Sequence, residues 1–244
     1  NRDIGNWNVS KVQDMTYMLA NAFAFNQDIS GWDVRNTPWM TGMFTNAFAF
    51  NQDIGKWDTS NLKTMGWMFY NAHAFNADLG NWKTGLVVNM QGTFVNARSF
   101  TSDLSNWDVG KVSQMGSMFR NAHSFTSDLS NWNTGAATNM SYLFEGAHVF
   151  NSDLSEWDVS LVNNMCNMFE NTQVFDSDIS NWNVHNVRYK QRMFYNAQSF
   201  NQDLSQWCVS RHTSGKPPTD FDTGATAWTL PRPVWGTCPR GEDQ

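Results

Sequence analysis

Hydrophobic and polar residues follow one another along this chain in a pattern that returns at a constant interval, as from Trp7 to Trp32 and from Trp32 to Trp57. In residues 29–34 the apolar side chains follow the L-x-x-L-x-L rhythm of a leucine-rich-repeat strand, with alternate residues inward near its end. In residues 40–47 they step by three and four, which is the rhythm of one or two turns of α- or 3₁₀-helix. Each period therefore predicts one coil, with a short strand on one side and a short helical turn on the other.

The interval holds without insertion or deletion from Trp7 to Trp207. We number the positions of the repeat from 1 to 25, starting at Asn1, so that both tryptophans occupy position 7. Recurring residues include Asp28, Asp53, Asp78, Asp103 and Asp128 at position 3, Trp32, Trp57, Trp82 and Trp107 at position 7, Asn46 and Asn71 at position 21, and Phe50 and Phe75 at position 25. One copy is too short to bury its own apolar residues, so copies must stack. The sequence predicts a β-solenoid of the leucine-rich-repeat type.

The repeat divides the chain into two parts. Residues 1–208 form the predicted solenoid, with about eight repeats and a partial one. Residues 209–244 lack the repeat and contain five prolines, which exclude further regular coils. Phe221, Trp228, Leu230 and Trp235 give this segment apolar mass. We expect it to cap the C-terminal end of the solenoid, because an uncovered end exposes apolar side chains and unpaired backbone.

Composition narrows the function classes. The chain has 22 acidic against 16 basic residues, which argues against a nucleic-acid partner, since that partner needs a concentrated basic face. No apolar run approaches the length of a membrane helix. Cys208 and Cys238 flank the non-repetitive segment, so a single disulfide between them is plausible and would place the protein in an oxidising compartment.

The chain resembles the BspA-like leucine-rich-repeat surface proteins in its repeated unit F-N-x-D-[IL]-[SG]-x-W-[DN]-[VT]-[SG]-x-V-x-x-M-x-x-M-F-x-N-A. More narrowly, it is similar to the 25-residue repeat known from mycoplasma lipoproteins and other surface proteins. The resemblance covers residues 1–208. It implies a leucine-rich-repeat-like solenoid that is secreted or exposed at a cell surface, and it implies no common activity.

Two polar positions have structural interpretations. The aspartates at position 3 are expected to bond main-chain N–H groups at a turn, as in an Asx turn. Calcium bound between the coils is an alternative that we do not favour, because each coil offers few other oxygen ligands. The asparagines at position 21 are expected to form an internal hydrogen-bond ladder, since Asn tolerates left-handed backbone. No cofactor or metal is predicted.

The partner-binding surface is predicted on the sheet face at position 8, between the inward Trp and the following inward residue, because leucine-rich repeats usually present that face to partners. It includes Asp33, Asp58, Lys83, Asp108 and Asp158. A merely solvated surface is the alternative, because polar residues must cover every sheet. Aromatic residues that recur irregularly, such as Tyr17, Trp39 and Trp67, are expected to mark an interface if they form an exposed cluster near the N-terminal coils.

The sequence contains no recognisable catalytic motif. Acidic residues repeated in every coil favour a structural role, because paired catalytic carboxyls need unlike environments. We therefore expect a non-enzymatic, extracellular or surface-exposed scaffold that binds a protein or a glycan in adhesion or recognition. The alternative is a structural building block that self-associates in an extracellular assembly or filament.

Overall fold

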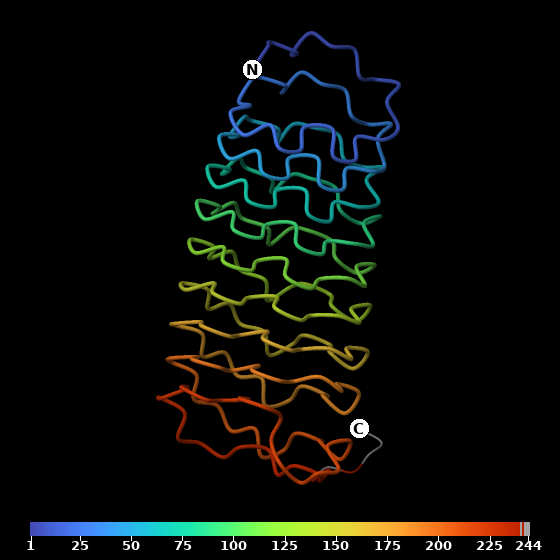
Figure 1. Ribbon diagram of the computed structural model, residues 1–244. Coiled ribbons are helices and arrows are strands. Elements are labelled where there is room, and N and C mark those ends of the chain that lie inside the picture. The colour runs from blue at the N-terminus through green and yellow to red at the C-terminus, as the bar shows by residue number, and fades with distance from the viewer. Residues whose placement is uncertain (240, 242–244) are drawn as a thin grey trace.

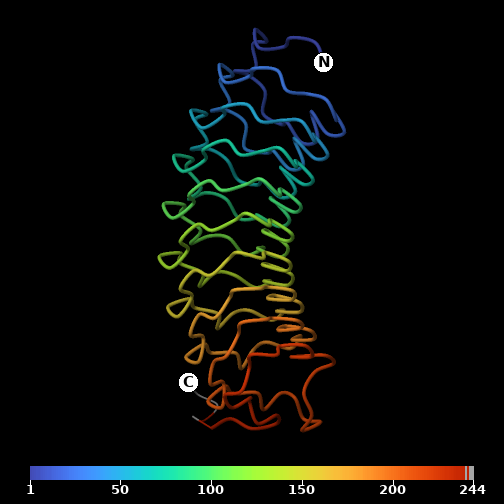
Figure 2. The same ribbon diagram turned by 90° about the vertical axis from the view of Figure 1, so that its left-hand side faces the viewer.

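Successive repeats stack as the coils of one elongated solenoid. The computed structural model describes residues 1–239 and 241, and its coils follow one another from the N-terminal end to the C-terminal end (Figure 1). A view turned by 90° shows the same stack with a gentle curve (Figure 2). The predicted repeat solenoid is therefore confirmed at the level of its architecture.

The predicted strand and helical turn within each coil are wrong. The described residues contain no helix and no strand, only turns and isolated parallel bridges. These bridges join position 14 of neighbouring coils, through Asp14, Trp39, Thr64, Asn89, Gln114, Asn139, Asn164 and Tyr189. The expected strand at 29–34 is instead a turn, in which Trp32 donates its N–H to the carbonyl of Ile29 at 3.1 Å.

The backbone of positions 15–21 divides its hydrogen bonds between two directions. In the second coil the N–H groups of Met40, Gly42, Phe44 and Asn46 donate to carbonyls of the next coil, at 2.7–3.2 Å. The N–H groups between them close turns within the coil, as from Met43 to Met40 at 3.2 Å. We call the surface formed by positions 14–21 the ladder face, since the carbonyls of position 14 accept the first of these inter-coil bonds. Positive φ at positions 17 and 21 excludes a continuous helix here, because helical residues need negative φ.

The interior is a continuous stack of large side chains. Phe44 lies 4.0 Å from Phe50 within its coil and 5.6 Å from Phe69 in the next, measured between ring centroids. Tryptophans at position 7 stack between coils, as do Trp32 and Trp57 at 6.4 Å. Their indole N–H groups donate to a carbonyl 28 residues earlier, so the one polar atom of each buried ring is satisfied. These stacked rings hold consecutive coils in one register.

The non-repetitive C-terminal segment follows the path of one more coil, although it lacks the repeat sequence. The Phe194 N–H donates to the Phe221 carbonyl at 2.8 Å, as the Phe169 N–H donates to the Met193 carbonyl at 2.9 Å one coil earlier. Phe221 and Trp228 also pack edge-on against Phe194, with ring centroids at 5.4 and 5.2 Å. The segment thus closes the apolar interior at the C-terminal end and continues the backbone ladder with a three-residue offset.

Candidate functional site

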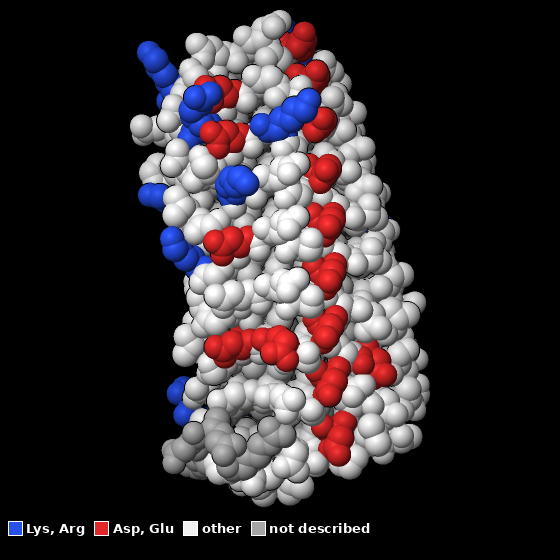
Figure 3. Space-filling model, turned by 180° about the vertical axis from the view of Figure 1, so that it is seen from behind, with Lys and Arg blue, Asp and Glu red and all other residues white. Residues whose placement is uncertain are grey.

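The aspartates of position 3 form one acidic line along the solenoid (Figure 3). Every member accepts, on its Oδ1, the N–H of the residue two places ahead; the set is Asp3, Asp28, Asp53, Asp78, Asp103, Asp128, Asp153, Asp178 and Asp203. All nine are solvent-exposed. The geometry is that of an Asx turn, repeated once per coil.

Serines of the next coil join this line between repeats. Ser127 Oγ donates to Asp103 Oδ1 at 3.1 Å and accepts the N–H of Leu104 at 2.8 Å. Hydrogen bonds from the backbone and side chain of Ser105 lower the pKa of Asp103, because they stabilise its charged form. The carboxylates of this line are therefore turn-forming groups, and at Asp103 the same bonds favour the charged form.

The side chains at position 8 line a different part of the surface from the backbone ladder. Ser60, Asn81, Lys83 and Asp108 contribute to a shallow groove of about 710 Å³ on this side. The inter-coil backbone bonds run along positions 15–21, so the side chains at position 8 do not lie on the surface that carries these bonds. The prediction that position 8 lies on a sheet face is therefore wrong. The predicted residues are nevertheless solvent-accessible, with Asp58, Lys83, Asp108 and Asp158 exposed and Asp33 partly exposed.

All four aspartates at position 8 also accept a turn-forming bond. Asp58, Asp108 and Asp158 accept the N–H two residues ahead on Oδ1, at 2.9–3.1 Å. Asp33 accepts the Arg35 N–H at 3.3 Å and pairs with its guanidinium at 2.8 Å. Asn133 makes the same turn with a neutral side chain. The side chain at position 8 therefore closes this turn whether or not it carries a charge.

The ladder face carries aromatic side chains on backbone that disfavours them. Tyr17 and Trp67, both at position 17, have φ of 54° and 59°. The left-handed region costs a residue other than Gly or Asn about 1–2 kcal/mol. Position 17 of the following coil is glycine in each case, Gly42 and Gly92. A Cβ on Gly42 would lie 2.1 Å from the Tyr17 ring, and one on Gly92 would lie 2.3 Å from the Trp67 ring. Each ring therefore rests directly on the backbone of the next coil.

Two further aromatic residues extend this cluster. Tyr70 packs edge-on against Trp67, with ring centroids 5.6 Å apart. Trp39 occupies position 14 of the second coil, where the parallel bridges join neighbouring coils, and its side chain is 44% exposed. We call Tyr17, Trp39, Trp67 and Tyr70 the aromatic patch. The sequence marks these residues as irregular, and their alternation with glycine at position 17 is the signal that could have located the patch.

A second aromatic group borders the patch at position 23. Phe23 stacks on Phe48 at 5.1 Å, and Phe48 stacks on His73 at 5.0 Å. Both phenylalanines are exposed. Further along the same position, His123 and His148 stack at 4.5 Å, and burial is the main cause that lowers the pKa of His123. Position 23 thus carries stacked rings from one coil to the next, in two groups.

Charge divides the ladder face into two halves. In the first four coils, Asp14 is the only charged residue at positions 14–20. In the last four, Arg120 pairs with Glu145 at 2.7 Å and Arg192 pairs with Glu170 at 2.6 Å. Burial would raise the pKa of Glu170, but its hydrogen bonds from Arg192 and Asn167 lower it overall. The aromatic patch thus lies on the neutral half.

Comparison with known families agrees with the repeated coil. Residues 1–82, 52–148 and 126–217 match, in three overlapping segments, the family described as "Mycoplasma protein of unknown function, DUF285". The chain belongs to the DUF285 family. No curated protein matches it. The part of the resemblance that refers to a mycoplasma repeat family is confirmed, and the family description assigns no activity.

The asparagines at position 21 connect the coils of this DUF285 chain. Each side-chain amide donates to the Oδ1 of the asparagine one coil earlier, at 2.6–3.1 Å, from Asn46, Asn71, Asn96, Asn121 and Asn196. Their φ values are positive. Gly146 interrupts the series, and Asn121 Oδ1 occupies the space where its Cβ would be, at 2.3 Å. The interruption opens a polar groove lined by His148, Gln173 and other amide side chains.

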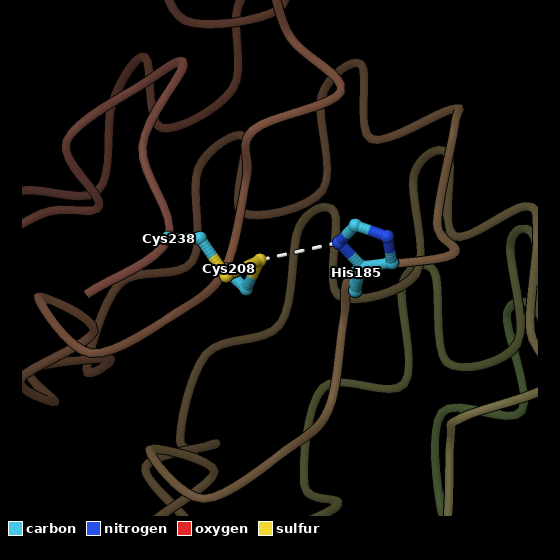
Figure 4. A group of neighbouring side chains, drawn as sticks. All are labelled: His185, Cys208 and Cys238. Carbon is cyan, nitrogen blue, oxygen red and sulfur yellow. Dashed lines mark hydrogen bonds between the residues drawn. A yellow bond between two sulfur atoms is a disulfide. The ribbon is translucent and has the colours of Figure 1, made fainter. Parts of the chain in front are cut away.

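A His185, Cys208 and Cys238 group lies where the last regular coils meet the C-terminal segment (Figure 4). Cys208 and Cys238 form a disulfide. His185 Nδ1 lies 3.2 Å from Cys208 Sγ, and Arg211 Nε donates to His185 Nε2 at 3.3 Å. Three potential metal ligands come together here, but the disulfide uses both sulfur atoms. In this DUF285 chain the group therefore links the last regular coil covalently to the C-terminal segment.

Lys190 is a buried lysine that replaces methionine at position 15 of the DUF285 repeat. Its Nζ donates to the Val187 carbonyl and lies 3.3 Å from His212 Nε2. Burial, followed by repulsion from Arg211, lowers the pKa of Lys190 to about 7. Burial and Lys190 lower the pKa of His212 to about 4. The sequence showed the substitution but gave no indication of its burial.

No helix able to cross a bilayer occurs among the described residues.

Proposed function

We propose that this chain is a non-enzymatic scaffold that recognises a protein or a glycan, and that it is secreted or displayed on a cell surface, as the BspA-like resemblance implies. The observation that carries the proposal is the contrast between the inside and the outside of the coils. Inner positions 7, 19 and 25 keep the same residue types, whereas positions 14, 17 and 20 of the ladder face differ from coil to coil. A frame that repeats while its surface changes suits recognition of one specific partner.

Two further observations support parts of this proposal. The Cys208–Cys238 disulfide supports an oxidising compartment. The position 3 aspartates share one turn geometry in every coil, which favours structure over catalysis, because acid and base roles need carboxyls in unlike environments.

The test is direct binding by the purified domain. It would be probed on arrays of glycans and extracellular-matrix proteins, with a glycan-hydrolysis assay run beside them. We expect binding to one class of array and no turnover. Absence of binding on both arrays, or turnover of a glycan, would contradict the recognition role.

The position 8 surface is tested separately. A quadruple variant with Asp→Asn at residues 33, 58, 108 and 158 removes four charges but keeps an acceptor for each turn, as Asn133 shows. We expect unchanged stability. Loss of binding to the array partner would assign recognition to the position 8 groove, and unchanged binding would leave the ladder face as the recognition surface.

Self-association is a second candidate, and the exposed phenylalanines at position 23 favour it. Phe23 and Phe48 stack with ring centroids 5.1 Å apart, and both are exposed. An exposed apolar group of this kind is typical of an interface. Light scattering over a concentration series tests it, with Phe48→Ser as the variant; a monomer at all concentrations would rule the assembly out.

A further inference from the structure

We infer that the aromatic patch binds a neutral, extended polysaccharide whose chain runs along the solenoid axis. This inference rests on the proposed recognition role and names its surface and ligand class. Four features of the ladder face support it: the seating of the rings, their spacing, the polar groups between them and the scarcity of charge around them.

The rings of Tyr17 and Trp67 are held in place before any ligand arrives. Each rests on the backbone of a glycine in the next coil, so it cannot collapse onto the surface any further. Tyr17 is 54% exposed, and Trp67 is partly exposed beside Tyr70. A pyranose ring presents a face of C–H groups, which packs on an aromatic ring, and an edge of hydroxyls. Pre-organised aromatic surfaces lose little entropy on binding.

The spacing of these rings matches a sugar chain. Tyr17 and Trp67 occupy the same position two coils apart, with Gly42 between them. Adjacent coils are joined by a parallel backbone ladder, so two coils span about 10 Å. This is close to the length of a disaccharide unit in an extended β-linked chain. One glycan running along the axis could therefore place every second sugar on a position 17 ring.

The groups around the rings are neutral hydrogen-bonding side chains. Thr41 lies in the coil between those of Tyr17 and Trp67, and its hydroxyl oxygen is 2.8 Å from that of Thr64 in the coil of Trp67. Asn89 and Gln91 follow in the next coil. All four are partly exposed. Hydroxyls and amides supply both donors and acceptors, which suits sugar hydroxyls. A protein interface would instead centre on a contiguous apolar core, and here polar groups separate the rings.

The negative charge of the chain disfavours acidic glycans as ligands of the aromatic patch. Asp14 is the single charge at positions 14–20 of the first four coils, and the whole chain has a net charge of −6. Lys63 at position 13 is exposed beside this half of the face, but a polyuronate would still meet the negative charge of Asp14 and of the chain as a whole. We therefore expect selectivity for neutral chains.

The decisive variant is Trp67→Asn. Asparagine already occupies the equivalent position at Asn167, with φ of 59°, so the backbone accepts it. The matched control is Tyr142→Asn, which removes an aromatic residue of the same position three coils away, where Arg120 lies 5.1 Å from its ring centroid.

Calorimetric titration would use neutral cello-, chito- and manno-oligosaccharides of two to six units. Oligogalacturonate would be titrated beside them as the acidic comparison ligand. We expect at least one neutral series to bind, with affinity rising with chain length up to the span of the patch. Trp67→Asn should weaken binding at least tenfold at unchanged melting temperature, and Tyr142→Asn should leave it unchanged. Tyr17→Ala, at an exposed site, provides the same test if Trp67→Asn fails to fold.

The outcomes separate the two proposals. Binding to a protein on the arrays, together with no binding to any neutral oligosaccharide, overturns the glycan inference and leaves the recognition scaffold standing. Tighter binding of oligogalacturonate, or equal effects of Trp67→Asn and Tyr142→Asn, also overturns it. Absence of binding on every array contradicts the proposed function itself.

Discussion

Replacing Lys190 with methionine should stabilise the protein, and the gain should depend on pH. Lys190 is 1% exposed and fills the position that methionine fills in the seven coils before it. Its ammonium has one backbone acceptor, the Val187 carbonyl, and faces His212, with Arg211 also contributing repulsion. Burial therefore favours the neutral amine and lowers the pKa of Lys190 from 10.5 to about 7.

The size of the effect follows from these two pKa values. Above the unfolded-state pKa of 10.5 the amine is neutral in both states and costs nothing. As the pH falls toward 7, the unfolded chain binds a proton that the folded chain does not, so stability is lost. Linkage gives a cost of roughly 4 kcal/mol at pH 7, and about 1.5 kcal/mol remains at pH 9.5. Lys190→Met removes this cost and fills the same space.

Urea unfolding at pH 7 and pH 9.5 measures the difference. Both proteins would carry Cys166→Ala, because Cys166 is not disulfide-bonded and would exchange with the disulfide at high pH. His212 titrates near pH 4 when folded, so it changes little in this range. Met165→Leu, at the same position one coil earlier, is the control and should show no pH-dependent change. A stability gain from Lys190→Met that is equal at both pH values would refute the reasoning.

Three further changes test the repeat itself. Gly146→Asn should restore the interrupted asparagine ladder, provided that the Asn121 amide rotates away from the new Cβ, which would lie 2.3 Å from its Oδ1. Two hydrogen bonds then form at a residue that already has positive φ, so the unfolding free energy should rise by about 1–2 kcal/mol, and a lower midpoint in urea would contradict this. Trp107→Phe leaves the Leu79 carbonyl without its 2.9 Å indole bond and opens a cavity, so it should destabilise by about 2–4 kcal/mol, whereas Trp7→Phe, at an exposed site, should change the midpoint little. Removing the disulfide with Cys208→Ala and Cys238→Ala frees a loop whose ends are 30 residues apart and should cost about 3.5 kcal/mol, a loss that a reducing agent should reproduce in the unaltered protein.

The interior was predictable from sequence because burial depends on residue type and period alone. Trp57, Phe50 and Met40 recur at fixed positions, and a large apolar side chain repeated in every copy has no stable place except the shared interior. Nothing about the local backbone was needed for this step.

The secondary structure within the coil was not predictable from the same spacing. Apolar steps of three and four fit a helix, but consecutive four-residue turns produce the same steps. The signal that separates them is positive φ, visible in the sequence as Gly42 and Asn46 four places apart. Trp67 occupies the same position as Gly42, and bulky residues rarely adopt left-handed backbone. For this reason the sequence did not indicate positive φ at position 17.

The C-terminal segment shows a different limit. Its prolines correctly exclude the repeat sequence, yet Phe221 and Trp228 still complete one more coil over Phe194. Backbone hydrogen bonds to Thr219 and Thr223 fix that path, and bonds of this kind do not depend on side-chain type. A sequence pattern cannot reveal a coil that is held mainly by main-chain groups.

Position 17 offers a way to separate aromatic residues that the fold needs from those that it merely tolerates. The tryptophan of position 7 is required, since its ring fills the interior and its N–H is bonded. At position 17 the backbone opposes Trp67, and Asn167 shows that an asparagine suffices there. Trp67→Asn relieves about 1–2 kcal/mol of backbone cost and loses the contact of the ring with Gly92. If thermal unfolding shows equal or higher stability, the fold does not need the ring, and its presence favours a role in recognition. A clear loss of stability would instead make Trp67 a packing residue of the ladder face.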